Sequence, residues 1–253
     1  MNTAERHRLI AQAVQETGTA TVTELTGLTG ASEMTIRRDL GHLAAQGVLE
    51  RFRGGARTLL LRGDEPPFAL RAHEGVDVKR RIAARVASLI TDGETVLLDS
   101  GTTCLEVARL LHGRPVTVMP LSLQAIAVLG DAPEPTVQLV PGGRPRVGEG
   151  ALIGPLTLAS LSALRFDTAV LGCCGLTAAD GMTAYDLDEA SVKKAVIASA
   201  RRVVVAADGT KLGRTAHAYV GPSSLVDILV TDSGAPSDEI AALESGGTTL
   251  ETV

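Results

Sequence analysis

From residue 77 to its C-terminus, the chain alternates short apolar runs with stretches of helical periodicity. The apolar runs have the length and β-branched content of buried strands: TVLLD, VTVMP, VQLV, DTAVLG, RVVVAA and DILVT. The stretches between them, such as CLEVARLL and SVKKAVIASA, carry apolar residues at helical spacing. Such alternation is typical of βαβ units around a largely parallel sheet. We therefore predict an α/β domain over residues 77–253.

Residues 1–61 have a different pattern, which begins with two short helices. The first is expected to end at Gly18. Thr21 and Glu24 have the spacing of a capping box, which predicts a second helix over residues 22–28. We expect this helix to bury its apolar residues, Val22, Leu25 and Leu28.

A third helix and a hairpin complete this N-terminal pattern. Ser32 is a suitable N-cap for SEMTIRRDLGHLAAQG, in which one face is apolar: Ile36, Leu40 and Leu43. The segment VLERFRGGARTLLL then predicts two strands around Gly54 and Gly55. Three helices followed by a hairpin indicate a winged helix-turn-helix, whose third helix would enter the major groove of DNA.

The candidate DNA contacts lie on the exposed half of the third helix and on the wing. They are Ser32, Glu33, Met34, Thr35, Arg37 and Arg38, together with Arg51, Arg53 and Arg57. Two adjacent arginines alone are more typical of a solvated helix face, but the helix-turn-helix context favours DNA. We expect the wing arginines to contact phosphates.

Charge and composition support this division of the chain. Residues 1–62 hold eight Lys and Arg against six Asp and Glu, whereas the whole chain has a net charge of -5. Residues 62–76 contain adjacent prolines and mixed charge, which predicts a connector between the domains. The charged N-terminus lacks a signal-peptide pattern and there is no long apolar run, so we expect a cytoplasmic protein without membrane contact.

The cysteines, Cys104, Cys173 and Cys174, are too few and too badly spaced for a disulfide framework or a zinc site. We interpret them as buried thiols. We predict no metal and no cofactor.

The strongest candidate for a ligand site is the segment DSGTT, which follows a predicted strand and leads directly into a helix. Its residues are Asp99, Ser100, Gly101, Thr102 and Thr103. Free backbone N–H groups, hydroxyl groups and the helix dipole would converge there, which suits a phosphate monoester. Simple helix capping is the alternative interpretation of this segment taken alone.

Two further loops follow predicted strands and should lie at the same edge of the sheet. One contains Gly142, Gly143 and Arg144. The other contains Asp208 and Lys211, beside glycines that permit a close turn. Lys211 is interpreted equally well as a ligand contact or as a solvated surface charge.

The segment SEMTIRRDLGHLAAQGVLERFRGGA resembles the helix-turn-helix and wing of the DeoR/GlpR family of regulators of sugar metabolism. The segments DSGTT, PGG, GEGALIGP and DGTKLG resemble the sensor domain of that family. The resemblance implies a sensor fold shared with ribose-5-phosphate isomerase and the CoA transferases, with phosphate at DSGTT and the sugar end at Asp208 and Lys211. It also implies that Asp39 holds an arginine or the wing, since phosphates repel a carboxylate.

Three residues leave the interpretation of the sensor open. Glu189 and Lys193 match family positions that either face the pocket or lie on the helix surface, and we expect Lys193 to be a surface residue. The chain has Pro120 and Leu121 where the family usually has Thr-Asn. Loss of an amide at Leu121 would alter which ligand group is recognised, unless this leucine simply packs.

We therefore predict a DNA-binding regulator, most simply a repressor of a carbohydrate operon, that is not an enzyme and is controlled by a phosphorylated sugar or a related metabolite. The partners expected are an operator in double-stranded DNA, this effector and a second copy or three further copies of the chain. The alternative is an isomerase of sugar phosphates with Glu189 as its base. A nucleotide sensor would differ from the first hypothesis only in its ligand.

Overall fold

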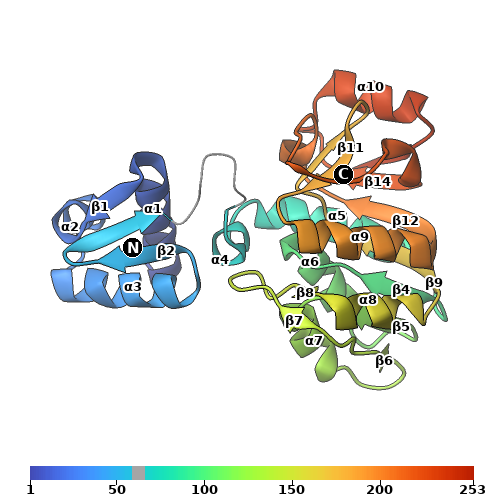
Figure 1. Cartoon of the computed structure of the whole chain (residues 1–253), viewed down its shortest axis with the longest axis horizontal. Helices are drawn as coiled ribbons and strands as arrows, with labels where there is room; N and C mark the ends of the chain where they lie inside the picture. The colour runs from blue at the N-terminus through green and yellow to red at the C-terminus, as the bar shows by residue number, and fades with distance from the viewer. Residues whose placement is uncertain (59–65) are drawn as a thin grey trace. The chain divides into compact units, whose positions relative to one another are not determined.

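The computed structural model describes residues 1–58 and 66–253, which form two compact units, Met1–Glu74 and Gly75–Val253. Residues 59–61, the predicted end of the second wing strand, and residues 62–65 of the predicted connector lie outside the described residues. Within the rest of that connector, α4 (Phe68–Arg71) is assigned to the first unit, and α5 starts at Val76. Figure 1 shows the elements of both units.

The N-terminal unit is a winged helix-turn-helix, as predicted. Its helices are α1 (Thr3–Thr17), α2 (Val22–Thr29) and α3 (Glu33–Ala45). Within residues 1–58, β1 (Thr19–Thr21), β2 (Leu49–Phe52) and β3 (Gly55–Thr58) form an antiparallel sheet in the order β1-β3-β2. Gly55 is required where β1 approaches β3, because a Cβ there would lie 2.3 Å from the carbonyl oxygen of Ala20.

One apolar core joins the helices of this unit to its sheet. Leu25 of α2 is buried in it together with the apolar face of α3, Ile36, Leu40 and Leu43. The capping box at Thr21 and Glu24 is present, with reciprocal hydrogen bonds. The expectation for Leu28 is wrong: its side chain is 51% exposed. Leu28 lies in the last turn of α2, where its direction has rotated away from that of Val22 and Leu25.

The C-terminal unit contains the predicted parallel sheet, in the order β15-β14-β12-β9-β4-β5-β6. All its neighbouring strands are parallel. Among residues 66–253, its strands are β4 (Thr95–Leu98), β5 (Thr117–Pro120), β6 (Val137–Gln138), β9 (Phe166–Leu171), β12 (Ala200–Ala206), β14 (Ile228–Thr231) and β15 (Thr249–Thr252). Six of these strands coincide with the apolar runs predicted from the sequence, and β15 adds a seventh at one edge of the sheet.

Helices connect these strands, and short elements follow several of them. The helices are α5 (Val76–Leu89), α6 (Thr102–Leu111), α7 (Leu123–Gly130), α8 (Pro155–Ser162), α9 (Leu187–Ser199) and α10 (Ser237–Ser245), with single 3-10 turns η1 (Gly209–Lys211) and η2 (Ser223–Leu225). Two small antiparallel sheets were not predicted. They are the hairpin of β7 (Arg144–Pro145) and β8 (Leu152–Ile153), and the sheet of β10 (Gly175–Thr177), β11 (Gly181–Ala184) and β13 (Ala218–Gly221).

The order of the strands defines where a ligand can bind. After β4 the chain adds β5 and β6 on one side, then returns to the other side of β4 and adds β9, β12, β14 and β15. The direction of winding therefore reverses between β4 and β9. Helices α6 and α7 pack together, and α8 packs against α9 (Figure 1). In open α/β sheets, the carboxyl ends of the strands at such a reversal border the ligand crevice.

Candidate functional site

Helix α3 presents a polar, exposed surface at its N-terminal half. Ser32 is the N-cap, and its hydroxyl group accepts a hydrogen bond from the backbone N–H of Thr35 at 3.3 Å. Burial of the opposite face in the core leaves Glu33, Met34, Arg37 and Arg38 exposed, with Met34 at 73%.

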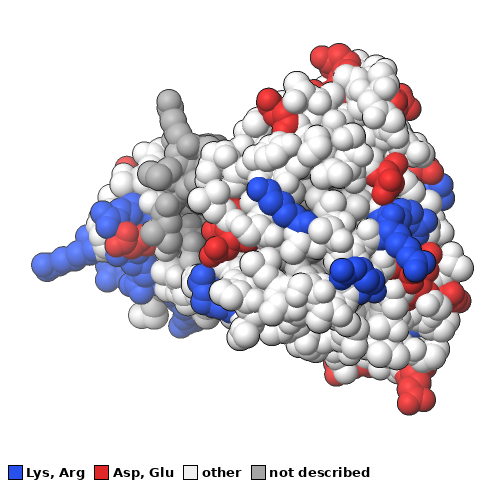
Figure 2. All heavy atoms as spheres, turned by 45° about the vertical axis from the view of Figure 1, so that its right-hand side comes forward, with Lys and Arg blue, Asp and Glu red and all other residues white. Residues whose placement is uncertain are grey.

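The basic residues of this surface differ in their partners. Arg37 donates to Glu33 one turn earlier at 3.1 Å, and Arg57 of β3 donates to Glu50 of β2. Within the described residues, Arg38, Arg51 and Arg53 form no ion pair. These three cations therefore carry their charge to solvent unopposed. Figure 2 shows basic side chains gathered on the visible face of the N-terminal unit, whereas the two signs mix on the C-terminal unit.

Arg51 reaches from the wing to the recognition helix. Its Nη1 atom would lie 3.5 Å from a Cβ at Gly41, in the middle of α3. Because Gly41 follows Arg37 by one helical turn, it lies on the same side of α3 as Arg37. The Arg51 guanidinium therefore lies beside the exposed face of the helix, a proximity that sequence reasoning did not find.

Asp39 is buried, 3% exposed, and faces α1 instead of the exposed surface of α3. Its carboxylate accepts from Arg6 at 2.6 Å and lies 2.9 Å from Nε2 of His7. Burial alone would raise the pKa of Asp39, but hydrogen bonds from Arg6 and His7 outweigh it and hold the pKa below its usual value. The expectation that Asp39 holds an arginine is confirmed, and the arginine comes from α1.

In the C-terminal unit, the predicted phosphate loop connects β4 to α6. Gly101 is the N-cap of α6 with a φ of 108°, and no side chain caps this helix. The first N–H groups of an α-helix have no partner within the helix, so those of Thr102 and Thr103 are available to an anion. Both threonines are buried, at 6% and 8% exposure. A backbone cradle of this kind suits a phosphate group.

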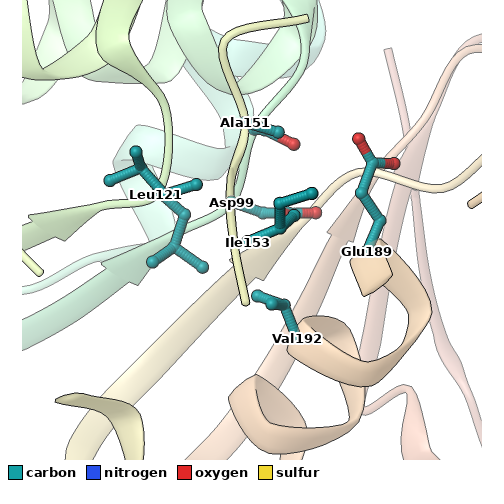
Figure 3. Close-up of a pocket in the computed structure, with 8 residues that line it drawn as sticks. Asp99, Leu121, Ala151, Ile153, Glu189 and Val192 are labelled. Atoms are coloured by element: carbon teal, nitrogen blue, oxygen red, sulfur yellow. The ribbon is translucent and has the colours of Figure 1, made fainter. Parts of the chain in front are cut away.

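A shallow hollow, open to solvent, lies beside this loop at the reversal between β4 and β9; with the solvent at its mouth it measures about 180 Å³. Figure 3 shows its lining, which is Asp99, Ser100, Leu121, Ala151, Leu152, Ile153, Glu189 and Val192. The structure thus brings together Asp99, Ser100 and Glu189 of the predicted effector residues. The others do not line this hollow, and their contact with an effector stays a prediction.

The buried ion pair between Asp99 and Lys193 lies at the hollow. The ammonium group of Lys193 donates to Oδ2 of Asp99, which also accepts from the backbone N–H of Gly172 after β9. Lys193 is 4% exposed, so the expectation of a surface residue is wrong. Burial lowers the pKa of Lys193, but attraction by Asp99, Cys174 and Glu189 outweighs this effect and raises it. Lys193 therefore stays charged.

Glu189 is held by an arginine of the β7–β8 connection. Nη1 of Arg146 lies 3.2 Å from Oε1 of Glu189, and its Nε lies 3.3 Å from Asp186, the N-cap of α9. Burial lowers the pKa of Arg146, but attraction by Glu189, Asp186 and Glu149 raises it overall. Asp99 is thus paired with Lys193, and Glu189 with Arg146, which Glu189 shares with Asp186.

Leu121 occupies the wall between these groups and β5. Its side chain is 1% exposed, and it points into the region between β5 and residues 151–153 (Figure 3). Leu121 packs in the core and also lines the hollow, and its effect on which ligand group is recognised stays a prediction. An asparagine there would place an amide on this wall.

The loop with Gly142 and Gly143 packs against α8. Thr157 donates to the carbonyl oxygen of Gly142 at 3.0 Å, and a Cβ at Gly143 would lie 2.1 Å from the Thr157 hydroxyl oxygen. Arg144 is exposed and lies 3.5 Å from Asp188 on α9. These glycines are therefore explained by packing, independently of any ligand.

The loop with Asp208 and Lys211 packs beside the carboxyl end of β14. Asp208 accepts from the backbone N–H of Thr210, and the N–H of Gly209 donates to Asp232 at 2.7 Å. Gly209 is close-packed, because a Cβ there would lie 2.4 Å from the backbone nitrogen of Ala235. The effector role of Asp208 and Lys211 stays a prediction.

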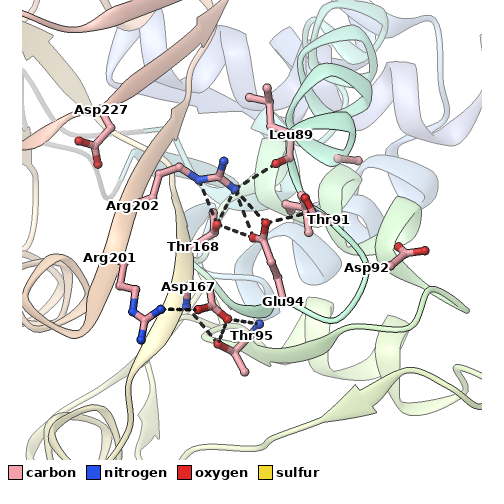
Figure 4. Close-up of polar contacts among 12 residues, drawn as sticks. Leu89, Thr91, Asp92, Glu94, Thr95, Asp167, Thr168, Arg201, Arg202 and Asp227 are labelled. Carbon is pink, nitrogen blue, oxygen red and sulfur yellow. Dashed lines mark hydrogen bonds and ion pairs between the residues drawn. The ribbon is translucent and has the colours of Figure 1, made fainter.

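A second polar cluster lies at the opposite, amino ends of the central strands (Figure 4). Arg202 of β12 donates to Glu94 at 3.2 Å and to Thr168 at 2.7 Å. Asp167 accepts from both the backbone and the hydroxyl group of Thr95. These bonds fasten the starts of β4, β9 and β12 together, far along the strands from the hollow, and serve the stability of the sheet.

Three further features concern other classes of site. The three cysteines are free and buried, as predicted. Within residues 1–58 and 66–253, no three His, Cys, Asp or Glu side chains are placed to hold a metal ion. No helix in this described part of the chain has both the length and the apolar character needed to cross a bilayer.

Comparison with known families accounts for both units. Residues 6–59 match the DeoR-like helix-turn-helix domain, and residues 74–233 match the DeoR C terminal sensor domain. The second match alone covers more than half of the chain.

Similar proteins match the chain along nearly its whole length. The HTH-type transcriptional regulator GlpR of Haloferax volcanii is 32% identical over 98% of this chain and 96% of its own. The glycerol-3-phosphate regulon repressor of Escherichia coli K12 is 32% identical over 99% of each. Among solved structures, ribose 5-phosphate isomerase A from Methanocaldococcus jannaschii aligns with 55% of each chain at 20% identity and a TM-score of 0.40.

Proposed function

Because the chain belongs to the DeoR family of DNA-binding transcriptional regulators, we propose that it represses an operon for the use of a phosphorylated sugar or polyol. Binding of that metabolite to the C-terminal unit would change the affinity of the N-terminal unit for its operator. The observation that carries the proposal is the uncapped start of α6 beside a hollow at the reversal of the sheet.

The exposed half of α3 supports specific contact with DNA. We propose that Arg37 and Arg38 reach base edges, with Ser32, Glu33, Met34 and Thr35 around them, as in other helix-turn-helix proteins. Arg51, Arg53 and Arg57 would contact phosphates from the wing. To contact DNA, Arg37 and Arg57 must first release their carboxylate partners, Glu33 and Glu50. The other three arginines can bind DNA without breaking an ion pair within the described residues.

The loop before α6 supports an anionic effector. We propose that the N–H groups of Thr102 and Thr103 bind the phosphate, with help from the hydroxyl groups and from the helix dipole. The rest of the effector would extend into the hollow toward Asp99 and Glu189. A phosphorylated ligand also agrees with the name of the Escherichia coli relative, a repressor of the glycerol-3-phosphate regulon.

An isomerase activity has less support. Proton transfer at carbon needs a base whose pKa is tuned near neutral pH. Glu189 is instead engaged by the permanently charged Arg146. The curated relatives named above are transcriptional regulators over the same length of chain.

Assembly and location follow from the proposed contact with DNA. A single winged helix buries little DNA surface, so we propose a homodimer or homotetramer on a symmetric operator. The regulator would act in the cytoplasm, where a bacterium or archaeon keeps its DNA.

The test combines two measurements on the full chain. Triose, pentose and hexose monophosphates are screened for a rise in melting temperature, since a ligand of the folded state stabilises it. Each stabilising compound is then titrated into a complex with duplex DNA selected from a random pool. We expect at least one to change the DNA affinity. Stabilisation without any effect on DNA binding would contradict the proposed control.

A further inference from the structure

The lining of the hollow beside α6 combines carboxylates with apolar side chains. Asp99 comes from the end of β4 and Glu189 from the first turn of α9, and both point toward the hollow (Figure 3). The rest of the lining is mostly apolar: Leu121, Ala151 and Ile153 lie beside Asp99, and Val192 follows Glu189 by one turn of α9. A ligand that fits there needs hydrogen-bond donors for the carboxylates and carbon–hydrogen surface for the apolar side chains.

The cations around the hollow are already engaged by carboxylates without a ligand. The ammonium group of Lys193 is committed to Asp99 and to the carbonyl oxygen of Gly172, which lies 2.9 Å away. The guanidinium of Arg146 is shared between Glu189 and Asp186. Three carboxylates thus face two cations, and neither cation is uncommitted.

A second anionic group placed in the hollow would meet these carboxylates without a spare cation. The neighbourhood is buried, with Asp99 3% and Glu189 8% exposed, so water screens the repulsion only weakly. Hydroxyl groups, in contrast, can donate to these carboxylates, because a carboxylate has about four acceptor sites and can accept several hydrogen bonds.

We propose that the hollow selects the uncharged, hydroxylated end of the effector, so that the regulator responds to monophosphates and rejects bisphosphates and phosphorylated sugar acids. This inference rests on the proposed function, in which the N–H groups at the start of α6 hold a single phosphate. Ser100 belongs both to that loop and to the lining of the hollow, so one small molecule can reach both. Glu189 is then a residue that determines specificity by charge.

The experiment compares pairs of ligands that differ by one charged group at the distal end. Titration calorimetry on the full chain first ranks triose, pentose and hexose monophosphates. The tightest is then compared with analogues that carry a second phosphate or a carboxylate there, such as fructose 6-phosphate with fructose 1,6-bisphosphate, or glucose 6-phosphate with 6-phosphogluconate. We expect the monophosphate to bind roughly tenfold more tightly or better.

Two variants test the cause of this discrimination. Glu189→Gln removes one negative charge and leaves Arg146 in place. It should therefore reduce, severalfold, the ratio of the dissociation constant of the doubly charged analogue to that of the monophosphate. Asp188→Asn removes a neighbouring charge that does not line the hollow, and should leave the ratio unchanged. The ligand pairs alone test the inference in the parent protein if Glu189→Gln fails to fold.

The outcomes separate the two hypotheses. Monophosphates that bind no more tightly than their doubly charged analogues would overturn the inference and leave the proposed phosphate site intact. An unchanged ratio in folded Glu189→Gln would also overturn it. If no monophosphate binds, the proposed function fails and the inference fails with it.

Discussion

Lys193 on α9 donates to Asp99 at the end of β4, and the two side chains are 5% and 4% exposed. Their pairing connects α9 to the strand that leads into the proposed phosphate loop. A second contact, from the N–H of Gly172 to Asp99, adds the end of β9. Three segments that border the sheet reversal are therefore joined through one carboxylate.

Lys193→Met should destabilise the C-terminal unit by about 3–5 kcal/mol, because it leaves Asp99 charged and buried without a cation. Adding Asp99→Asn should restore part of this loss, since the uncompensated charge is removed. Denaturant unfolding of the full chain, followed by circular dichroism, measures both. Equal stability of Lys193→Met and the parent would show that the pair is not needed for folding.

The local features of the chain were predictable, whereas this pair was not. The capping box at Thr21, the N-cap at Ser32 and the apolar face of α3 depend on residues within a few positions of one another, so the sequence contains them directly. Lys193 and Asp99 lie 94 positions apart. Sequence periodicity on α9 did not indicate that one of the adjacent lysines, Lys193 and Lys194, turns inward.

The elements that were missed are short or lie at an edge. Strands β1 and β10 span three residues each, Thr19–Thr21 and Gly175–Thr177, too few to display an alternating pattern. The loops with Gly142 and Gly209 carry glycine for close packing against α8 and residues 234–235. Sequence alone does not distinguish a glycine needed for packing from one needed for a ligand. The structure explains these glycines by packing, and contact of the two loops with an effector stays a prediction.

Substitutions in the N-terminal unit should separate base contacts from phosphate contacts. Arg38→Ala should weaken binding to the selected operator by about 1–3 kcal/mol while binding to random DNA changes less. Arg37→Ala should act likewise, with a smaller effect because Glu33 must be displaced first. Equal operator affinity of mutant and parent at fixed salt would contradict a base contact.

Arg53→Ala should instead weaken binding to every DNA sequence. The slope of the logarithm of the binding constant against the logarithm of the salt concentration should fall in magnitude by about one, the contribution of one phosphate contact. Arg51→Ala should behave similarly. Titrations of operator and random DNA at several salt concentrations measure both effects. An unchanged slope would place these arginines away from the DNA backbone.

Asp39→Asn should reduce the stability of the N-terminal unit by about 1.5–3 kcal/mol at pH 7, because it removes the charge that Arg6 pairs with. Folding lowers the pKa of Asp39. Its ionised carboxylate therefore contributes to the free energy of unfolding above the ordinary aspartate pKa of about 3.9, and this contribution is lost as the pH falls through the lowered pKa of the folded state. The difference between parent and variant should therefore shrink below about pH 4. Amide hydrogen exchange within residues 1–58 measures this difference in stability. A difference that does not change with pH would contradict a stabilising role for the ionised Asp39 carboxylate.

Gly41→Ala should stabilise α3 by up to about 1 kcal/mol, because glycine is a poor helix former and the added Cβ would meet Arg51 at an ordinary contact distance of 3.5 Å. DNA affinity should change little. Gly55→Ala is the matched control and should be destabilising, since its Cβ would lie 2.3 Å from the Ala20 carbonyl oxygen. Hydrogen exchange of the N-terminal unit compares the two.

The last prediction concerns coupling between the units. The double substitution Thr102→Val and Thr103→Val keeps the shape of two buried side chains, so the C-terminal unit should fold. It deletes two hydroxyl groups at the proposed phosphate loop and keeps the backbone N–H groups, so effector affinity should fall without being abolished. If effector and operator favour different conformations, their binding is linked by a reciprocal free energy of typically about 1–3 kcal/mol. The double mutant should therefore bind operator normally and need a higher effector concentration for release.

Lys211→Ala tests the second loop in the same assay. It should shift the release curve if its ammonium group reaches the effector, and should match the parent if the lysine serves only the packing of residues 208–213. Operator affinity is titrated against the best monophosphate for the parent, the double threonine mutant and Lys211→Ala. Release of the threonine mutant at the parent's effector concentration would show that the hydroxyl groups of the loop before α6 do not bind the phosphate. The uncapped backbone N–H groups alone would then have to account for effector binding, because they are the same in both proteins.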